Sequence, residues 1–485
     1  MKKQAREIFG LPLLFWGLWL ALLILWMGRF VISFMSMYLV KDLHVDAGVA
    51  GTIVSMYGFG GIVGCLFGGS LSDRFGRQSM IIGGEIGSAI MLIVLSFIGD
   101  PFVMGAMLLV YGAISSIPTP AVAAYIADVV PVRAQKRAYT LQTWAVNFGF
   151  AIGPIIANQL VKISYTLMFY AEAIILVVAT VMLGTFFHEA RKLAEHDVAS
   201  PSLVISSDAS SLSSVISSEG EAGVEKSSLG PTVSASEDLS ASLCSGRDDV
   251  SDPRSGREDR DASRSTRDGD AAAVAPEQPV SMIANYRRAL ADWPFMSMVV
   301  LMFAYTIAYF QLTSGLPIAL TQLGMGTDQY SVLLTINGGI LCLLQIPALA
   351  VFNRMSNTRV LVLGMLMTAV GYAFQIGATS WHGFAIAAVL WTLGELGTFP
   401  IAATTVASLA PADARGTYQG LYNLVWSLSN GAAPLVGGWI IGGFGSRTLW
   451  ICCTIMFLLV AAGLAATKGA RERAVARNLR ESLAG

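Results

Sequence analysis

The chain has 485 residues, of which 54% are hydrophobic and only 13% are charged. This composition excludes an ordinary soluble globular protein. The net charge of −1 gives no reason to expect nucleic acid or another polyion as a partner.

A helix needs about 20 apolar residues to cross the hydrocarbon core of a membrane. Twelve segments meet this length, at residues 11–40, 47–70, 79–99, 101–128, 138–161, 164–188, 294–322, 328–352, 358–379, 382–409, 416–443 and 447–467. The first segment could be taken for a signal peptide, but Arg29 lies in its middle and further spans follow. We therefore predict an all-α membrane protein with twelve transmembrane helices.

Lysine and arginine gather before the first span, in alternate loops and after the last span. The loops between these carry only Lys41, Lys162 and Arg447. Short loops rich in Lys and Arg stay on the cytoplasmic side. We therefore predict a multi-pass protein of the inner (plasma) membrane with both termini cytoplasmic.

Residues 189–290 interrupt the apolar pattern with serines and charges of both signs, and aromatic residues are almost absent. Such a segment cannot bury enough apolar surface to offset the entropy of ordering it. We predict a disordered cytoplasmic linker, either passive or carrying phosphorylation or docking sites. It divides the chain into 1–188, 189–290 and 291–485, the last with a short basic tail.

The two apolar parts resemble each other. A shift of 280 residues pairs Gly58 with Gly338, Asp73 with Asn353, Arg74 with Arg354, Pro120 with Pro400, Pro131 with Pro411 and Pro154 with Pro434. This many matches indicate a duplicated six-helix unit. Transporters built from two such bundles bind their substrate between them, near the membrane midplane.

A charged turn joins the second and third spans. It reads Gly69-Ser-Leu-Ser-Asp73-Arg74-Phe-Gly76-Arg77. Gly76 permits a sharp turn at little steric cost, and the two arginines suit a cytoplasmic loop. The turn resembles the G-x-x-x-D-R-x-G-R loop of the major facilitator superfamily.

The resemblance implies a gate in which Asp73, Arg77 and Asp128 latch the loop to the start of the eleventh helix, near Gly416. The latch would close when the cavity faces outward. A basic loop that only sets the topology is the alternative. The second copy, at Asn353, has lost the acid, so the latch is expected on one side only.

The fifth span carries Gly149, Gly153 and Pro154, which match the centre of the antiporter motif of the same superfamily. The sequence departs from that motif at Thr140 and at 157–158. Small residues let helices approach closely. The element therefore indicates either close packing alone or a part in antiport.

Ionisable residues at membrane depth are candidates for function. Arg29 in the first span lies four and seven residues before Ser33 and Ser36, which predicts a polar stripe on the helix. The resemblance implies that the first helix lines the cavity, so the stripe would face it. An ion pair within the amino-terminal half is the alternative. Glu172 and Glu85, on the sixth and third spans, are weaker candidates for proton or substrate coupling.

Glu395 on the tenth span shares its face with Trp391, Thr392 and Thr398. The stretch Gly394-Glu395 to Pro400 resembles bacterial drug-efflux members of the superfamily. A carboxyl group in a low-dielectric cavity holds a proton more readily than one in water. We therefore predict a proton-binding or cation-binding role for Glu395, with neutral, hydrogen-bonded packing as the alternative.

The seventh and eighth spans offer further candidates for the cavity wall. Tyr305 and Tyr309 lie at a helical spacing, and Gln311 begins a family-like Q-x4-L-P. Asn337 is the candidate on the eighth span. Packing is the alternative for the tyrosines.

The resemblance implies a transporter that works by alternating access. We expect proton-coupled efflux of small amphipathic compounds, with Glu395 taking protons and Arg29 tuning that acid or holding an anionic group. The rival is a proton-coupled importer of a sugar, peptide or organic anion, and a receptor on a transporter scaffold is remote.

The other expected partners are a small-molecule substrate, protons and the lipid bilayer, with the protein a monomer. The five cysteines and four histidines show no metal-ligand spacing. The sequence also lacks a phosphate-binding G-x-x-x-x-G-K-[ST] loop. We expect no enzyme activity, catalytic residue, metal or cofactor.

Overall fold

The computed structural model describes residues 7–198, 282–411 and 414–484. A two-residue hairpin, β1 (Glu7–Ile8) and β2 (Leu11–Pro12), precedes the helices. Its turn needs positive φ angles, 52° at Phe9 and 72° at Gly10. The other described elements are helical.

The helices before residue 199 are α1 (Leu13–Gly28), α2 (Val31–Lys41), α3 (Ala47–Phe75), α4 (Arg77–Leu95), α5 (Pro101–Ser116), α6 (Pro118–Val129), α7 (Val132–Val161) and α8 (Tyr165–Val198). Those after residue 281 are α9 (Met282–Ala291), α10 (Trp293–Tyr309), the 3₁₀ turn η1 (Phe310–Leu312), α11 (Gly315–Gln322), α12 (Thr327–Phe352), α13 (Asn357–Ile376), α14 (Trp381–Leu409), α15 (Arg415–Phe444), α16 (Ser446–Ala466) and α17 (Lys468–Ala484).

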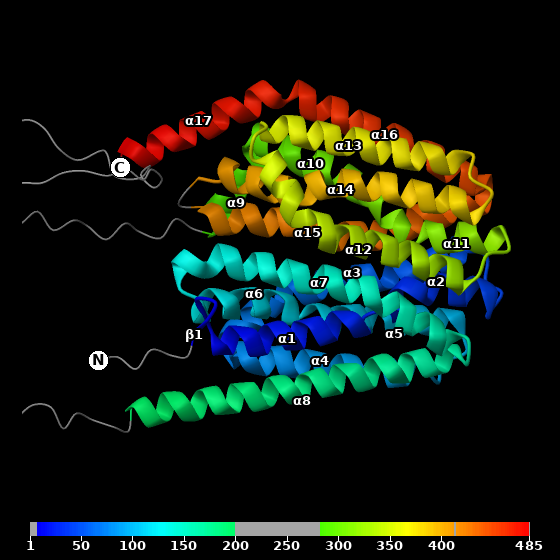
Figure 1. The fold of residues 1–485 in the computed structure, drawn as a ribbon, viewed down its shortest axis with the longest axis horizontal. Helices are drawn as coiled ribbons and strands as arrows, with labels where there is room; N and C mark the ends of the chain where they lie inside the picture. The colour runs from blue at the N-terminus through cyan, green and yellow to red at the C-terminus, as the bar shows by residue number, and fades with distance from the viewer. Residues whose placement is uncertain (1–6, 199–281, 412–413, 485) are drawn as a thin grey trace, which may run out of the picture. The chain divides into compact units, whose positions relative to one another are not determined.

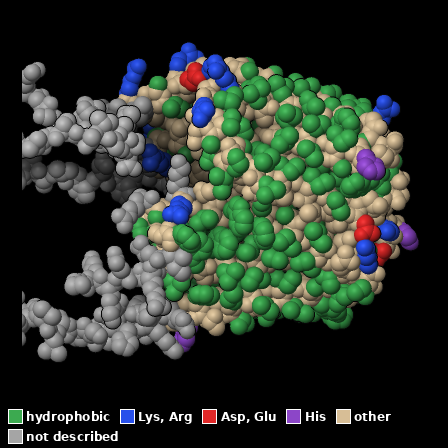
Figure 2. Space-filling view, in the orientation of Figure 1, with side chains coloured by type: hydrophobic (Ala, Val, Ile, Leu, Met, Phe, Trp, Pro, Cys, Tyr) green, Lys and Arg blue, Asp and Glu red, His purple; other side chains and the backbone are tan. Residues whose placement is uncertain are grey.

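These helices form twelve segments that are long and apolar enough to cross a membrane. The prediction of twelve spans is confirmed. Hydrophobic side chains cover the face seen in Figure 2, and charged side chains gather toward its two ends. That distribution fits a protein whose sides contact lipid.

The expected linker is shorter than predicted at both ends. Helix α8 continues to Val198, and α9 already begins at Met282. Both stretches are rich in Ala, Glu, Lys, Leu or Arg, which favour a helix. Residues 199–281, where disorder is predicted, lie outside the described residues.

The helices on both sides of residues 199–281 belong to one compact unit. Figure 1 shows α1–α8 and α10–α16 as two neighbouring groups. We call the end with β1, α9 and α17 the near end, and the end where α2 and α11 finish the far end. The groups meet through α3 against α15 and through α7 against α12.

Glycines let the two groups approach closely. A Cβ atom on Gly58 of α3 would lie 2.1 Å from the backbone nitrogen of Gly431 on α15. Nearer the far end, a Cβ atom on Gly51 of α3 would lie 2.2 Å from the carbonyl oxygen of Pro434 on α15. Gly69 and Gly420 continue these two helices toward the near end, and there a Cβ would meet no atom within 4 Å. The glycine contacts are therefore tight from the middle to the far end, and they are absent at Gly69 and Gly420.

Polar contacts also join the groups at the far end. Asp328 at the start of α12 accepts a hydrogen bond from Asn158 at 2.7 Å and pairs with Lys162 at 2.6 Å. Closer to the middle, Thr335 donates to the carbonyl of Ala151 at 2.9 Å.

Two adjacent glycines on α12 test the close packing. A Cβ on Gly338 would lie 2.7 Å from the backbone of Ala151, whereas one on Gly339 would meet open space. We expect Gly338→Ala to lower stability by about 1–3 kcal/mol because the helices must separate. Gly339→Ala should be neutral or slightly stabilising. Thermal unfolding in one detergent measures both, and equal unfolding temperatures would contradict the packing.

Candidate functional site: two polar clusters at broken helices

The first span is broken at its centre. Helix α1 ends at Gly28, and Arg29 and Phe30 are not helical before α2 begins at Val31. The predicted continuous stripe from Arg29 to Ser33 and Ser36 is therefore wrong, although both serines are buried on α2. A side chain on Gly28 would collide with Ile175 of α8 at 2.6 Å, so the glycine lets α1 and α8 approach at the break.

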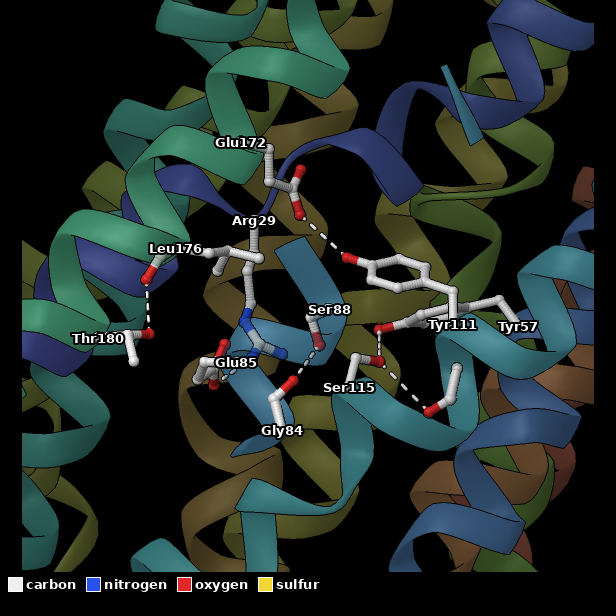
Figure 3. Close-up of polar contacts among 11 residues, drawn as sticks. Arg29, Tyr57, Gly84, Glu85, Ser88, Tyr111, Ser115, Glu172, Leu176 and Thr180 are labelled. Carbon is white, nitrogen blue, oxygen red and sulfur yellow. Dashed lines mark hydrogen bonds and ion pairs between the residues drawn. The ribbon is translucent and has the colours of Figure 1, made fainter. Parts of the chain in front are cut away.

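Glu172 of α8 satisfies the backbone groups that the break frees. Its Oε2 accepts hydrogen bonds from the amides of Phe30, at 3.1 Å, and Val31, at 2.7 Å. Its Oε1 accepts one from the hydroxyl of Tyr111 at 3.1 Å (Figure 3). Unpaired amides are costly in hydrocarbon. Glu172 therefore acts as the N-terminal cap of α2 from another helix.

Arg29 is paired within the same half of the chain. Its Nη2 lies 2.7 Å from Oε1 of Glu85 on α4 (Figure 3), and its guanidinium lies 5.7 Å from the ring centre of Trp26. The side chain of Glu85 is 3% exposed and that of Arg29 is 21% exposed. The charge of Arg29 is thus already balanced by an acid, and Glu172 is a second carboxyl group nearby.

The seventh span is broken at the corresponding place. Helix α10 ends at Tyr309, and α11 begins at Gly315 after the turn η1. Gln311 fixes this turn by donating a hydrogen bond to the carbonyl of Ala433 on α15 at 2.8 Å. The first break thus depends on a carboxyl group and the second on a neutral amide.

Glu395 of α14 lies beside the second break. Its Oε1 accepts a hydrogen bond from the hydroxyl of Tyr309 at 2.7 Å, and its Oε2 accepts one from Nδ2 of Asn337 at 2.7 Å. The side chain is buried. Within the described residues, no Lys, Arg or His forms an ion pair with Glu395. Unlike Glu85, this acid has only neutral hydrogen-bond donors.

Four half-buried aromatic side chains form a wall next to Glu395. The rings of Tyr309 and Phe399 lie 4.9 Å apart, those of Phe399 and Trp426 4.7 Å, and those of Trp426 and Phe310 5.6 Å. The rings of Tyr309 and Phe310 also lie 5.6 Å apart, so each ring contacts two others of the group. Aromatic faces attract cations. The sequence pattern does not single out Phe310 or Phe399 among 23 phenylalanines, although Phe399 precedes Pro400 in the motif of the tenth span.

The two clusters occupy equivalent positions of the internal repeat. The shift of 280 residues that relates the halves pairs Arg29 with Tyr309, Tyr57 with Asn337, and Ser115 with Glu395. The same two positions are hydrogen-bonded in each half, with the direction reversed: Ser115 donates to the hydroxyl of Tyr57 at 3.3 Å, whereas Asn337 donates to Glu395 at 2.7 Å. The same scaffold thus holds a paired cation in one half and a carboxyl group without a cation in the other.

Other residues predicted for the cavity pack inside the carboxy-terminal half. Tyr305 is fully buried and stacks on Tyr309 at 5.9 Å. Trp391 lies against Tyr372 of α13, and Thr398 donates to the carbonyl of Gly394 within α14.

The charged turn between the second and third spans is sharp, as Gly76 predicts. Gly76 has φ 88° and ends α3, and Arg77 pairs with Asp128 at 2.5 Å. Arg74 is exposed, over the ring of Phe75. The side chain of Asp73 lies outside the described residues, so its contact with the start of α15 stays a prediction.

The predicted motif of the fifth span lies against the first. A Cβ on Gly149 of α7 would lie 2.6 Å from Trp26, and one on Gly153 would lie 2.9 Å from the carbonyl of Met27. Pro154 lies inside α7. The described residues include no group of three His, Cys, Asp or Glu that could hold a metal ion.

Twelve apolar spans in two related halves, with buried ionisable groups at mid-span, define a membrane transporter of the two-bundle class. The family model of the Major Facilitator Superfamily matches residues 18–333 and 295–483. The chain belongs to this superfamily and is a multi-pass membrane transporter.

Individual relatives are distant. The chain is 21% identical to the uncharacterized MFS-type transporter YqjV of Bacillus subtilis, over 87% of this chain and 84% of YqjV. It is 26% identical to the quinolone resistance protein NorA of Staphylococcus aureus, over 33% of this chain and 42% of NorA. A solved POT family transporter in complex with a thioalcohol-conjugated peptide superposes with a TM-score of 0.66 at 15% identity, over 96% of this chain and 98% of that one. The last likeness concerns the fold alone.

The pairing of Arg29 with Glu85 can be tested by stability. Glu85→Leu leaves the guanidinium without its acid, and we expect a loss of about 2–3 kcal/mol, below the range for a fully buried pair because Arg29 is partly exposed. The double variant Arg29→Met/Glu85→Leu removes both charges and should recover most of that loss. Unfolding in mixed micelles measures both, and a double variant no more stable than Glu85→Leu would contradict the pairing.

Proposed function

We propose that this transporter exports lipophilic cations in exchange for protons, with Glu395 as the shared binding group. The observation that carries the proposal is that Glu395 is a buried carboxyl group with neutral donors and an aromatic wall beside it. A proton or an organic cation can neutralise it in turn. The match to the quinolone resistance protein NorA supports export of drug-like compounds.

The pairing of Arg29 bears on whether the proposed substrate is a cation or an anion. A free arginine at mid-span would attract an organic anion. Such an arginine would therefore favour the alternative function, import of an organic anion. Arg29 is instead bound to Glu85 at 2.7 Å, so an anion would have to displace that acid. Glu395 needs no such displacement. The charges therefore support a cation.

The contacts between the halves support alternating access. The halves touch closely from the middle to the far end, while Gly69 and Gly420 face open space toward the near end. We propose that the Arg77–Asp128 pair, with Asp73, closes the near end in the opposite state. The basic residues of that end support a cytoplasmic location for it and an inner (plasma) membrane setting.

Exchange can be distinguished from import by the direction of the proton gradient. In sealed vesicles with purified protein, an acidic lumen drives a cation inward by exchange, whereas an acidic exterior drives entry together with protons. A permanently charged lipophilic cation avoids passive trapping of weak bases, and clamping the membrane potential removes electrical accumulation. We expect accumulation only with the acidic lumen.

Glu395→Gln keeps the size and hydrogen bonding of the side chain but cannot exchange a proton. We expect it to reduce gradient-driven accumulation to the level of protein-free vesicles, because no proton can leave when the cation binds. Glu472→Gln, at an exposed position on α17, is the matched control and should transport like the wild type. Accumulation that survives Glu395→Gln, or that appears only with an acidic exterior, would contradict the proposal.

A further inference from the structure

The two parts of the first span have different neighbours. Helix α1 lies against α7 of its own half, where Gly149 admits the backbone at Trp26. Helix α2 contacts α11 of the other half at the far end. The ring of Phe34 on α2 also lies 5.3 Å from that of Tyr330 on α12. A change in the joint between α1 and α2 would therefore alter a contact between the halves.

Glu172 holds this joint. It accepts hydrogen bonds from the amides of Phe30, at 3.1 Å, and Val31, at 2.7 Å, and it is 1% exposed. The amide of Phe30 also donates to the carbonyl of Gly28 at 3.0 Å. Hydrogen bonds to an ionised acceptor are about twice as strong as neutral ones, and a negative charge also stabilises the N-terminus of a helix. Both contributions fall when the carboxylate binds a proton.

The charged and titratable groups around Glu172 come from three neighbouring elements. Tyr111 on α5 donates to its Oε1, and Arg29 belongs to the joint itself. Arg29 is bound to Glu85 on α4, and Tyr57 on α3 lies 5.3 Å from Tyr111, ring to ring. Arg29 is thus bound to Glu85, and within the described residues Glu172 forms no ion pair that proton uptake would break.

In the described residues of the second half, no carboxyl group binds the backbone amides of the break. The residue equivalent to Glu172 is Cys452, which is exposed on α16. The break of the seventh span depends on Gln311, whose amide does not titrate. The titratable joint is therefore specific to the first span.

We infer that Glu172 is a positioning residue that couples proton binding to the contact between α2 and α11 at the far end. Its protonation weakens the hold of α8 on the start of α2. The helix α2 can then move, and it separates from α11. This inference rests on the proposed function in taking the proton as the coupling ion. It adds a second proton-responsive group, separate from the one that meets the substrate. The carboxyl group keeps its atoms and exchanges only the proton.

Spin labels can report the movement directly. In a variant without native cysteines, labels at Lys41, the end of α2, and at Leu323, after the end of α11, give the far-end distance in lipid nanodiscs without substrate. We expect acid pH to add a longer-distance population in the otherwise wild-type protein. Glu172→Gln should show that population at every pH, since the neutral amide imitates the protonated acid.

A second variant covers the case in which Glu172→Gln does not fold. Tyr111→Phe removes one donor to the carboxylate but keeps the amide bonds, so the midpoint of the distance change should move to higher pH. A purely structural role of Tyr111 would leave the midpoint in place. Glu472→Gln is the control and should follow the wild type.

The outcomes separate this inference from the proposed function. Glu395→Gln should lose transport and keep the pH-dependent distance. A wild-type distance that does not respond to pH, or a Glu172→Gln distance that responds as the wild type does, would overturn the inference even if vesicles exchange cations for protons. If the vesicles show no exchange of the cation for protons, the proposed function is overturned instead.

Discussion

Backbone amides cannot remain unpaired in hydrocarbon, and this constraint governs the centre of the molecule. An unbroken helix satisfies it without help, but the first span of each half is interrupted. At the first break Glu172 of α8 accepts hydrogen bonds from the backbone amides. At the second break Gln311, within the turn itself, ties the chain to α15 through the carbonyl of Ala433. Polar groups at mid-membrane follow from the broken helices, and the chemistry proposed for the transporter uses those groups.

The distribution of charge between the two halves is the basis for proposing that one cluster binds the substrate and the other controls a change of shape. Arg29 and Glu85 neutralise each other, so neither is free to bind a solute ion. Among the described residues, the hydrogen-bond donors to Glu395 are the neutral groups of Tyr309 and Asn337, beside the aromatic wall. The 280-residue shift pairs the positions that differ, so the difference in charge lies in a few residues at equivalent positions.

The apolar lengths, the 280-residue shift and Gly76 were sufficient to predict the twelve spans, the two halves and the sharp turn. These features depend on local composition and backbone geometry. The break at Arg29 and Phe30 could not be predicted in this way, because its stabilising partner, Glu172, lies more than a hundred residues away. The pairing of Arg29 with Glu85 and the positions of Phe310 and Phe399 depend likewise on packing between distant segments. Sequence therefore identified Arg29, Glu172 and Glu395 as unusual, but it did not show which of them was already paired.

The central claim is that one carboxyl group, Glu395, holds either a proton or the transported cation. Its most direct test is the proton released when a permanently charged lipophilic cation binds to the purified protein in weakly buffered detergent solution, read with a pH-sensitive dye. Linkage between the two ligands predicts release of up to about one proton per bound cation where Glu395 is protonated beforehand, and none from Glu395→Gln. Binding without proton release in the wild type, or equal release from the variant, would contradict the account.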